Sequence, residues 1–282
     1  MALDLRGRVD GVAERVPPLA YALRVIDRYN DIRGNVDANS ITLTAFLALF
    51  AITLLAVAAI GFLDKTNIDV AKEITKALGL SGDAAKVVTN AVNTARKSAR
   101  FASIVGFVGV ITVGTSFTNA IGTAYNACWG VKGRGLIDRA RGLVWLAGIG
   151  VCFIAGMVLT NWWTSLPAWL APALAVITVA INAVAWAFTS WWLPNRRITF
   201  RAMLPAALVG AVMLEVLKLV AGVWVPRLIN HASELWGAIG VVFALIAWIL
   251  VFGRVVVYVA VIEVLEAERL GVKPPSSTTL LP

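Results

Sequence analysis

Long apolar runs alternate with shorter polar and basic segments along the chain after residue 40. Each run is close to the length of about 20 residues that a helix needs to cross the hydrocarbon core of a bilayer. The six runs cover residues 41–63, 101–122 with a helical continuation to Trp129, 143–162, 168–191, 204–225 and 237–263. The pattern predicts an all-α fold, a polytopic membrane helix bundle with six transmembrane spans.

Composition agrees with a membrane location. The 282 residues are 59% hydrophobic and only 15% charged, and the mean hydropathy is +0.81. A soluble domain is typically about 45–50% apolar and about 25% charged. Cys128, Cys152 and the single histidine, His231, form no ligand cluster in the sequence, so we expect no disulfide framework, no metal site and no cofactor. No nucleophile–base pair can be assembled either, so we expect no catalytic residue and no enzymatic activity.

The polar segments define the rest of the organisation. Residues 1–38 form the N-terminal segment, where apolar residues at helical spacing over 19–32 predict a basic amphipathic helix on the cytoplasmic face. A solvated tail is the alternative for this segment. Residues 64–100 predict an extracytoplasmic helical hairpin between spans one and two. The six-span membrane domain then covers residues 39–268, and residues 269–282 form a cytoplasmic tail.

Basic residues orient the predicted bundle. With the N-terminus inside, the inner segments hold 15 Lys and Arg residues and the outer segments hold eight. Inner loops carry the excess of Lys and Arg in membrane proteins, so both termini are expected in the cytoplasm. We therefore expect the basic residues behind the net charge of +9 to contact anionic lipid head groups and not nucleic acid. The first 40 residues are polar and charged, so we expect no cleavable signal peptide.

Charges inside the last two apolar runs are the most informative residues. Glu215 and Arg254 each lie about 11 residues from the inner end of their run, which places both about 16 Å deep. Lys218 is one helical turn from Glu215, and Asn182 falls at nearly the same level in the fourth run. Charges persist at this depth when they pair or face a polar interior. We therefore expect Asn182, Glu215, Lys218 and Arg254 to meet, either as a substrate pathway or as a structural ion pair.

Other polar residues indicate helix packing or head-group contact. Ser, Thr and Asn within a span commonly bond to neighbouring helices, and this is the role expected for Thr112, Thr115, Ser116, Asn119 and Asn126. Glu263 falls near the inner interface, where a carboxylate reaches water. The basic loops at 132–141 and 196–201 are expected to gather anionic lipid, with head-group contacts from Arg196, Arg197 and Arg201.

Several stretches together resemble the YihY/BrkB family of bacterial inner-membrane proteins. They are YNACWGV at 125–131, LPNRRITFRAMLPAALVGA at 193–211, ELWGAIGVVFALIAWI at 234–249 and VIEVLEAE at 261–268. These are similar to the family's N-x-x-W-G-V run, its L-P-N basic loop, its Tyr-Gly start to the final span and its terminal G-A-E. The chain departs from this pattern at Trp236, Phe200 and Val261-Ile262. The resemblance implies six helices with both termini cytoplasmic, a multi-pass location in the cell inner membrane, and a role like that of transporters or lipid exporters.

Two functional hypotheses stay open at this point. The first is a transporter or exporter of a lipid or amphiphile, in which the charged cluster engages a polar head group. The second is a non-catalytic scaffold or accessory subunit of a cell-envelope complex that docks through the outer hairpin. The expected partners are membrane lipids, with a homo-oligomer or an envelope complex left open and no nucleic acid. An occluded or lateral cavity reaching Glu215 and Arg254 would favour the first hypothesis, and a tightly packed interior with an apolar patch on the hairpin would favour the second.

Overall fold

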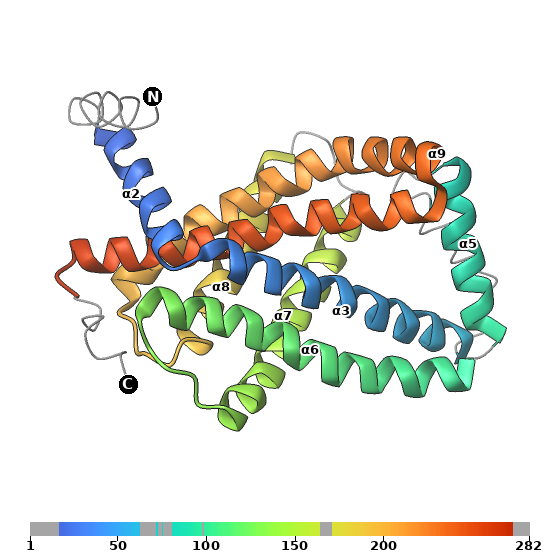
Figure 1. Cartoon of the computed structure of the whole chain (residues 1–282), viewed down its shortest axis with the longest axis horizontal. Helices are drawn as coiled ribbons and strands as arrows, with labels where there is room; N and C mark the ends of the chain where they lie inside the picture. Colours follow the sequence, from blue (N-terminus) through green and yellow to red (C-terminus); the bar gives the residue numbers. More distant parts are fainter. Residues whose placement is uncertain are drawn as a thin grey trace.

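The computed structural model describes residues 17–62, 72, 75, 81–97, 99–163 and 171–272 as helices joined by turns (Figure 1). In chain order the helices are α2 (Pro17–Asp31), α3 (Gly34–Phe62), α5 (Gly82–Lys97), α6 (Ala99–Trp129), α7 (Leu136–Trp163), α8 (Ala171–Trp192) and α9 (Phe200–Arg269). Within these ranges there is no strand, and the predicted all-α bundle is confirmed.

The predicted spans fall on helices. Four segments are long and apolar enough to cross a membrane, namely Gly34–Leu54, Ile104–Trp129, Phe200–Ala232 and Ile239–Arg269. α8 adds a shorter apolar helix over Val176–Trp192, and α7 covers the predicted third span. α7 begins at Leu136 and not at residue 143, because the intervening LIDRARG holds no proline and only one glycine to interrupt a helix.

α9 is a helical hairpin whose two arms lie side by side (Figure 1). The reversal occurs at Gly237, which has φ 58° and ψ −138°. Glycine adopts this backbone conformation readily because it has no Cβ. Ile229 of the first arm packs with Val241 and Ala244 of the second arm. The two arms are the predicted fifth and sixth spans, and a single residue makes the turn between them.

The buried core lies at the end of the bundle that carries α2 and the last turns of α9 (Figure 1). Trp129 of α6 and Val257 of α9 are fully buried there. Small residues let the helices approach closely: a Cβ added to Gly253 of α9 would lie 2.7 Å from the Ala38 carbonyl oxygen of α3. Such backbone contacts through small residues are typical of helix pairs in membranes.

α2 packs on this end of the bundle through an aromatic contact. The Tyr29 ring stacks on Tyr258 of α9, with ring centroids 4.3 Å apart. Burial, together with the neighbouring Glu266 carboxylate, raises the pKa of Tyr21 to about 12, so its hydroxyl stays protonated at neutral pH. Residues 17–31 thus form the predicted helix, docked on α9, and the solvated-tail alternative is wrong for them.

α5 crosses the opposite end of the bundle, beside the reversal of α9 (Figure 1). The Ser81 backbone N–H donates to Asn230 Oδ1 at 3.1 Å, which ties the start of α5 to the first arm of α9. The second arm of the predicted outer hairpin is therefore a helix. The first arm, residues 64–80, lies outside the described residues except for positions 72 and 75.

Candidate functional site

A short polar chain links α8 to the first arm of α9. The Asn182 side-chain amide donates a short hydrogen bond to Glu215 Oε1. Lys218 Nζ donates to the same oxygen at 2.7 Å, forming an ion pair one helical turn along α9. The Lys218 side chain is 51% exposed and the Glu215 side chain 23% exposed. The chain therefore runs from the interior of the bundle toward its surface, and three of the four predicted residues meet.

Arg254 lies apart from this polar chain. Its side chain is exposed, whereas the ion pair of Glu215 is with Lys218. The expected contact between Glu215 and Arg254 is not formed. The contact is missing because Arg254 points in another direction around the axis of its helix, and not because it lies at another depth. Arg254 is two residues, about 200° of rotation, from both Phe252 and Val256, which face the α8 side of the second arm.

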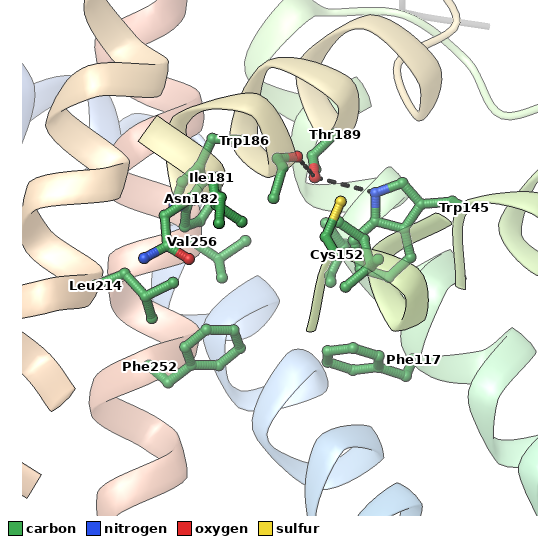
Figure 2. Close-up of a pocket in the computed structure, with 13 residues that line it drawn as sticks. Phe117, Trp145, Cys152, Ile181, Asn182, Trp186, Thr189, Leu214, Phe252 and Val256 are labelled. Carbon is green, nitrogen blue, oxygen red and sulfur yellow. Dashed lines mark hydrogen bonds between the residues drawn. The ribbon is translucent and has the colours of Figure 1, made fainter. Parts of the chain in front are cut away.

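An apolar cavity of about 200 Å³ lies between α6, α7, α8 and α9, next to the polar chain (Figure 2). Its lining is mostly aromatic and aliphatic, and consists of Phe117, Ile121, Trp145, Ile149, Cys152, Ile181, Asn182, Ala185, Trp186, Thr189, Leu214, Phe252 and Val256. The Trp145 indole N–H donates to Thr189 Oγ1 at 3.0 Å, so this polar pair in the wall is satisfied. Asn182 lines the cavity (Figure 2) and also belongs to the polar chain, so the Glu215–Lys218 ion pair lies at the edge of an apolar space.

A basic pocket of about 280 Å³ lies where the turn before α7 meets the connection from α8 to α9. It is lined by arginines and tryptophans, with one proline and one asparagine: Arg134, Arg141, Arg196, Arg197, Trp191, Trp192, Pro194 and Asn195. The pocket thus contains two of the three arginines that were predicted to contact head groups. The third, Arg201, is exposed on the first turn of α9 and is not part of this lining.

The arginines of the basic pocket are held in place by specific contacts. Arg141 donates to Asn195 Oδ1 at 3.0 Å and also to the Trp192 carbonyl oxygen. The Arg196 guanidinium lies over the Trp129 ring, 4.9 Å from the ring centroid. Planar guanidinium groups fixed in this way favour anions that accept two parallel hydrogen bonds, such as carboxylate and phosphate. The pocket can therefore recognise an anionic head group.

Glu263 is fully buried, which corrects the expectation that its carboxylate reaches water. The Trp129 indole N–H donates to Glu263 Oε1 at 3.2 Å, and the Tyr125 and Ser190 side chains lie beside it. Depth along the helix did not reveal this burial, because α9 continues to Arg269 and neighbouring helices cover its last turns. Trp129 and Glu263 both lie in stretches that resemble the family, and this shared resemblance was the only sign in the sequence of a contact between the two residues.

The polar residues of α6 divide into two groups. Asn126 does bond to a neighbouring segment as expected, because its Oδ1 accepts from the Asn195 backbone N–H at 2.8 Å. The remaining four line a polar groove between α3 and α6: Thr112, Thr115, Ser116 and Asn119. For these four, the expected role in packing between helices gives way to a groove that the sequence pattern did not reveal.

The sequence matches a known family and several related proteins. The family model described as Virulence factor BrkB matches residues 25–278. The inner membrane protein YhjD of Escherichia coli K12 is 25% identical over 280 residues, covering 88% of this chain and 81% of YhjD. An uncharacterized protein of Dickeya dadantii is 25% identical over 273 residues, covering 87% and 82% of the two chains. A UPF0761 membrane protein of Ralstonia nicotianae is 23% identical over 247 residues, covering 81% of this chain and 56% of its own. No solved structure matches the chain.

Proposed function

We propose that this chain, which belongs to the BrkB family of integral inner-membrane proteins, binds a lipid or other amphiphile within its helical bundle and moves it across the membrane. The proposal is a non-catalytic transport role. The observation that carries it is the apolar cavity whose edge bears the Asn182–Glu215–Lys218 chain. Such a site pairs an apolar volume with a charged group, as an amphiphile does.

The size of the cavity limits what it can hold. An apolar cavity of about 150 Å³ accommodates a ring the size of benzene. The cavity here, about 200 Å³, is therefore matched to a short alkyl segment or a single ring and not to a whole lipid. The polar chain at its edge would face the more polar part of the same molecule. The remainder of a larger amphiphile would extend between the helices into the bilayer.

The basic pocket supports a first encounter with an anionic molecule. Arg134, Arg141, Arg196 and Arg197 surround it, and the Lys and Arg distribution favours a cytoplasmic location for this end of the bundle. The inner leaflet carries anionic lipid that attracts such clusters. In this account both termini are cytoplasmic, the basic pocket collects the substrate at the inner leaflet, and the apolar cavity receives part of it.

The cavity reaches Asn182, which bonds to Glu215, but it does not reach Arg254; this partial match supports transport over the alternative role of scaffold or accessory subunit. An unfilled apolar space loses packing contacts among its lining side chains, and docking by a scaffold gains nothing from that loss. On α5, the proposed docking element of a scaffold, the exposed residues include the ion pair of Asp83 and Lys86 at 2.8 Å. A charged, solvent-exposed face of this kind is ordinary for a surface helix.

Reconstitution into liposomes tests the proposal. Fluorescently labelled phosphatidylglycerol would be placed in both leaflets, and dithionite would report how fast the inner-leaflet label becomes accessible. We expect wild-type protein to accelerate the exchange, and Ala185→Trp, which fills the cavity, to abolish the acceleration. Val184→Trp is the matched control, because Val184 is 61% exposed on the same helix and its side chain does not line the cavity. Equal rates for Ala185→Trp and wild type would refute a role for the cavity.

A further inference from the structure

A polar groove of about 470 Å³ runs between α3 and α6 and reaches the start of α7. Its lining is almost entirely polar: Asp37, Ser40, Thr44, Thr112, Thr115, Ser116, Asn119, Ala120, Thr123 and Arg139. α6 contributes residues to both the groove and the apolar cavity. Successive residues rotate by about 100° around the helix, so Phe117 and Ile121 of the cavity lie on the face opposite the groove residues. The groove is therefore a second site, separate from the cavity.

The hydroxyl groups of the groove present acceptor oxygens. Thr112, Thr115 and Ser116 donate their protons to backbone carbonyls one turn earlier on α6, at 2.8, 2.7 and 2.9 Å. Thr44 does the same on α3, at 2.8 Å. A hydroxyl has a single proton to donate, so once this proton is used, only lone pairs remain for a ligand. These four side chains therefore favour a ligand that carries several hydrogen-bond donors.

One acidic and one basic side chain, Asp37 and Arg139, line the same groove without forming an ion pair with each other. Asp37 lies in the first turn of α3 and Arg139 in the first turns of α7. Within the described part of the chain, neither Asp37 nor Arg139 forms an ion pair, and the Asp37 carboxylate accepts no hydrogen bond. Asp37 adds a negative charge to the acceptor oxygens, and Arg139 offers donors to an anion. The groove is complementary to a ligand that joins a cationic donor to an anion.

The groove opens to the exposed surface of the bundle, on a helix that is long and apolar enough to cross a membrane. Thr112, Ser116, Asn119 and Thr123 follow one stripe of α6 and are exposed. The stripe is about 16 Å long at about 1.5 Å per residue, roughly half of the hydrocarbon thickness of about 30 Å. A polar stripe facing lipid tails is unfavourable unless polar groups cover it. A head group in this stripe could keep its acyl chains in the bilayer.

We propose that the groove between α3 and α6 binds the head group of a phospholipid that carries a primary amine, as phosphatidylethanolamine does. The ammonium group has three N–H donors for Asp37 and the threonine and serine oxygens. The phosphate accepts from the Arg139 guanidinium. A trimethylated ammonium has the same charge but no N–H donor, and a glycerol head group has no charge to pair with Asp37. The site is independent of the apolar cavity and of whether the protein transports lipid.

Lipid binding to the purified full-length protein, measured by native mass spectrometry, tests this site. Phosphatidylethanolamine, phosphatidylcholine and phosphatidylglycerol with identical acyl chains would compete at equal concentration. We expect wild type to retain phosphatidylethanolamine about tenfold better than phosphatidylcholine, the order of magnitude of losing charge-assisted hydrogen bonds. Asp37→Asn should remove this preference. Asp83→Asn, an exposed aspartate on α5, should preserve it.

A second variant separates binding from folding. Ser116→Ala removes one exposed acceptor oxygen and should weaken phosphatidylethanolamine binding without changing the unfolding temperature. Equal retention of the amine and trimethylated lipids by wild type would overturn the proposal. So would an unchanged preference in Asp37→Asn. A stable dimer that binds no lipid and protects the α6 stripe from labelling would also overturn it, since a second copy would then occupy the groove. Failure of the transport assay alone leaves this binding result unaffected.

Discussion

The buried contact between Trp129 and Glu263 leads to a quantitative expectation for stability. Both side chains are fully buried, and the Trp129 indole N–H donates to Glu263 Oε1 at 3.2 Å. Removing one partner leaves the other polar group buried without its hydrogen bond, which costs about 1–3 kcal/mol. Glu263→Leu should therefore destabilise the protein by about 1–3 kcal/mol. Trp129→Phe should cost about 2–4 kcal/mol, because it also removes part of a large buried ring.

The double variant Trp129→Phe/Glu263→Leu distinguishes a specific contact from two separate packing effects. Replacing both partners by apolar groups leaves neither the indole N–H nor the carboxylate without its partner, so the double variant should be about 1–2 kcal/mol less destabilised than the sum of the singles. The assay is reversible unfolding of purified protein in mild detergent, followed by the intrinsic fluorescence of the other tryptophans. Additivity within about 0.5 kcal/mol would refute the reasoning, because it would mean that the two side chains do not act on each other.

Two further changes test packing and the basic pocket. Gly253→Ala places a Cβ 2.7 Å from the Ala38 carbonyl oxygen and should lower stability by about 1–3 kcal/mol, measured by thermal unfolding. Gly222→Ala in the same helix meets no atom within 4 Å and should be neutral or slightly stabilising, so equal losses for both would contradict the close α3–α9 contact. Arg196→Lys loses the planar group over Trp129 and should lower stability by about 0.5–2 kcal/mol. Unchanged unfolding of this variant would show that the ring contact contributes nothing.

The span pattern could be predicted from the sequence because it depends on local composition. Apolar runs near the length of a bilayer crossing became helices. The reversal between the last two spans was not predicted in detail, because the runs left residues 226–236 between them, whereas the structure continues the helices and turns at Gly237. The polar chain was also predictable in part, since Glu215 and Lys218 are neighbours on any helix.

The angular placement of residues around the helices could not be predicted in the same way. Glu215 and Arg254 were expected to meet because their depths agree, but the second arm of α9 turns Arg254 away from α8. The burial of Glu263 depends in the same way on which helices cover its face. The groove beside Asn119 requires the pairing of α3 with α6, and a periodic pattern in one helix does not state its partner.

Reactivity of Cys152 offers the most direct measurement of amphiphile binding in the apolar cavity. Cys152 lines the cavity and is partly accessible, whereas Cys128, the second cysteine of the chain, is fully buried. The rate of Cys152 modification by a maleimide would be measured on protein in amphipol, with and without dioctanoyl phosphatidylglycerol. If the cavity receives part of the amphiphile, the lipid slows modification in a saturable manner, and Ala185→Trp removes the protection. A modification rate that stays the same at saturating lipid would contradict the account.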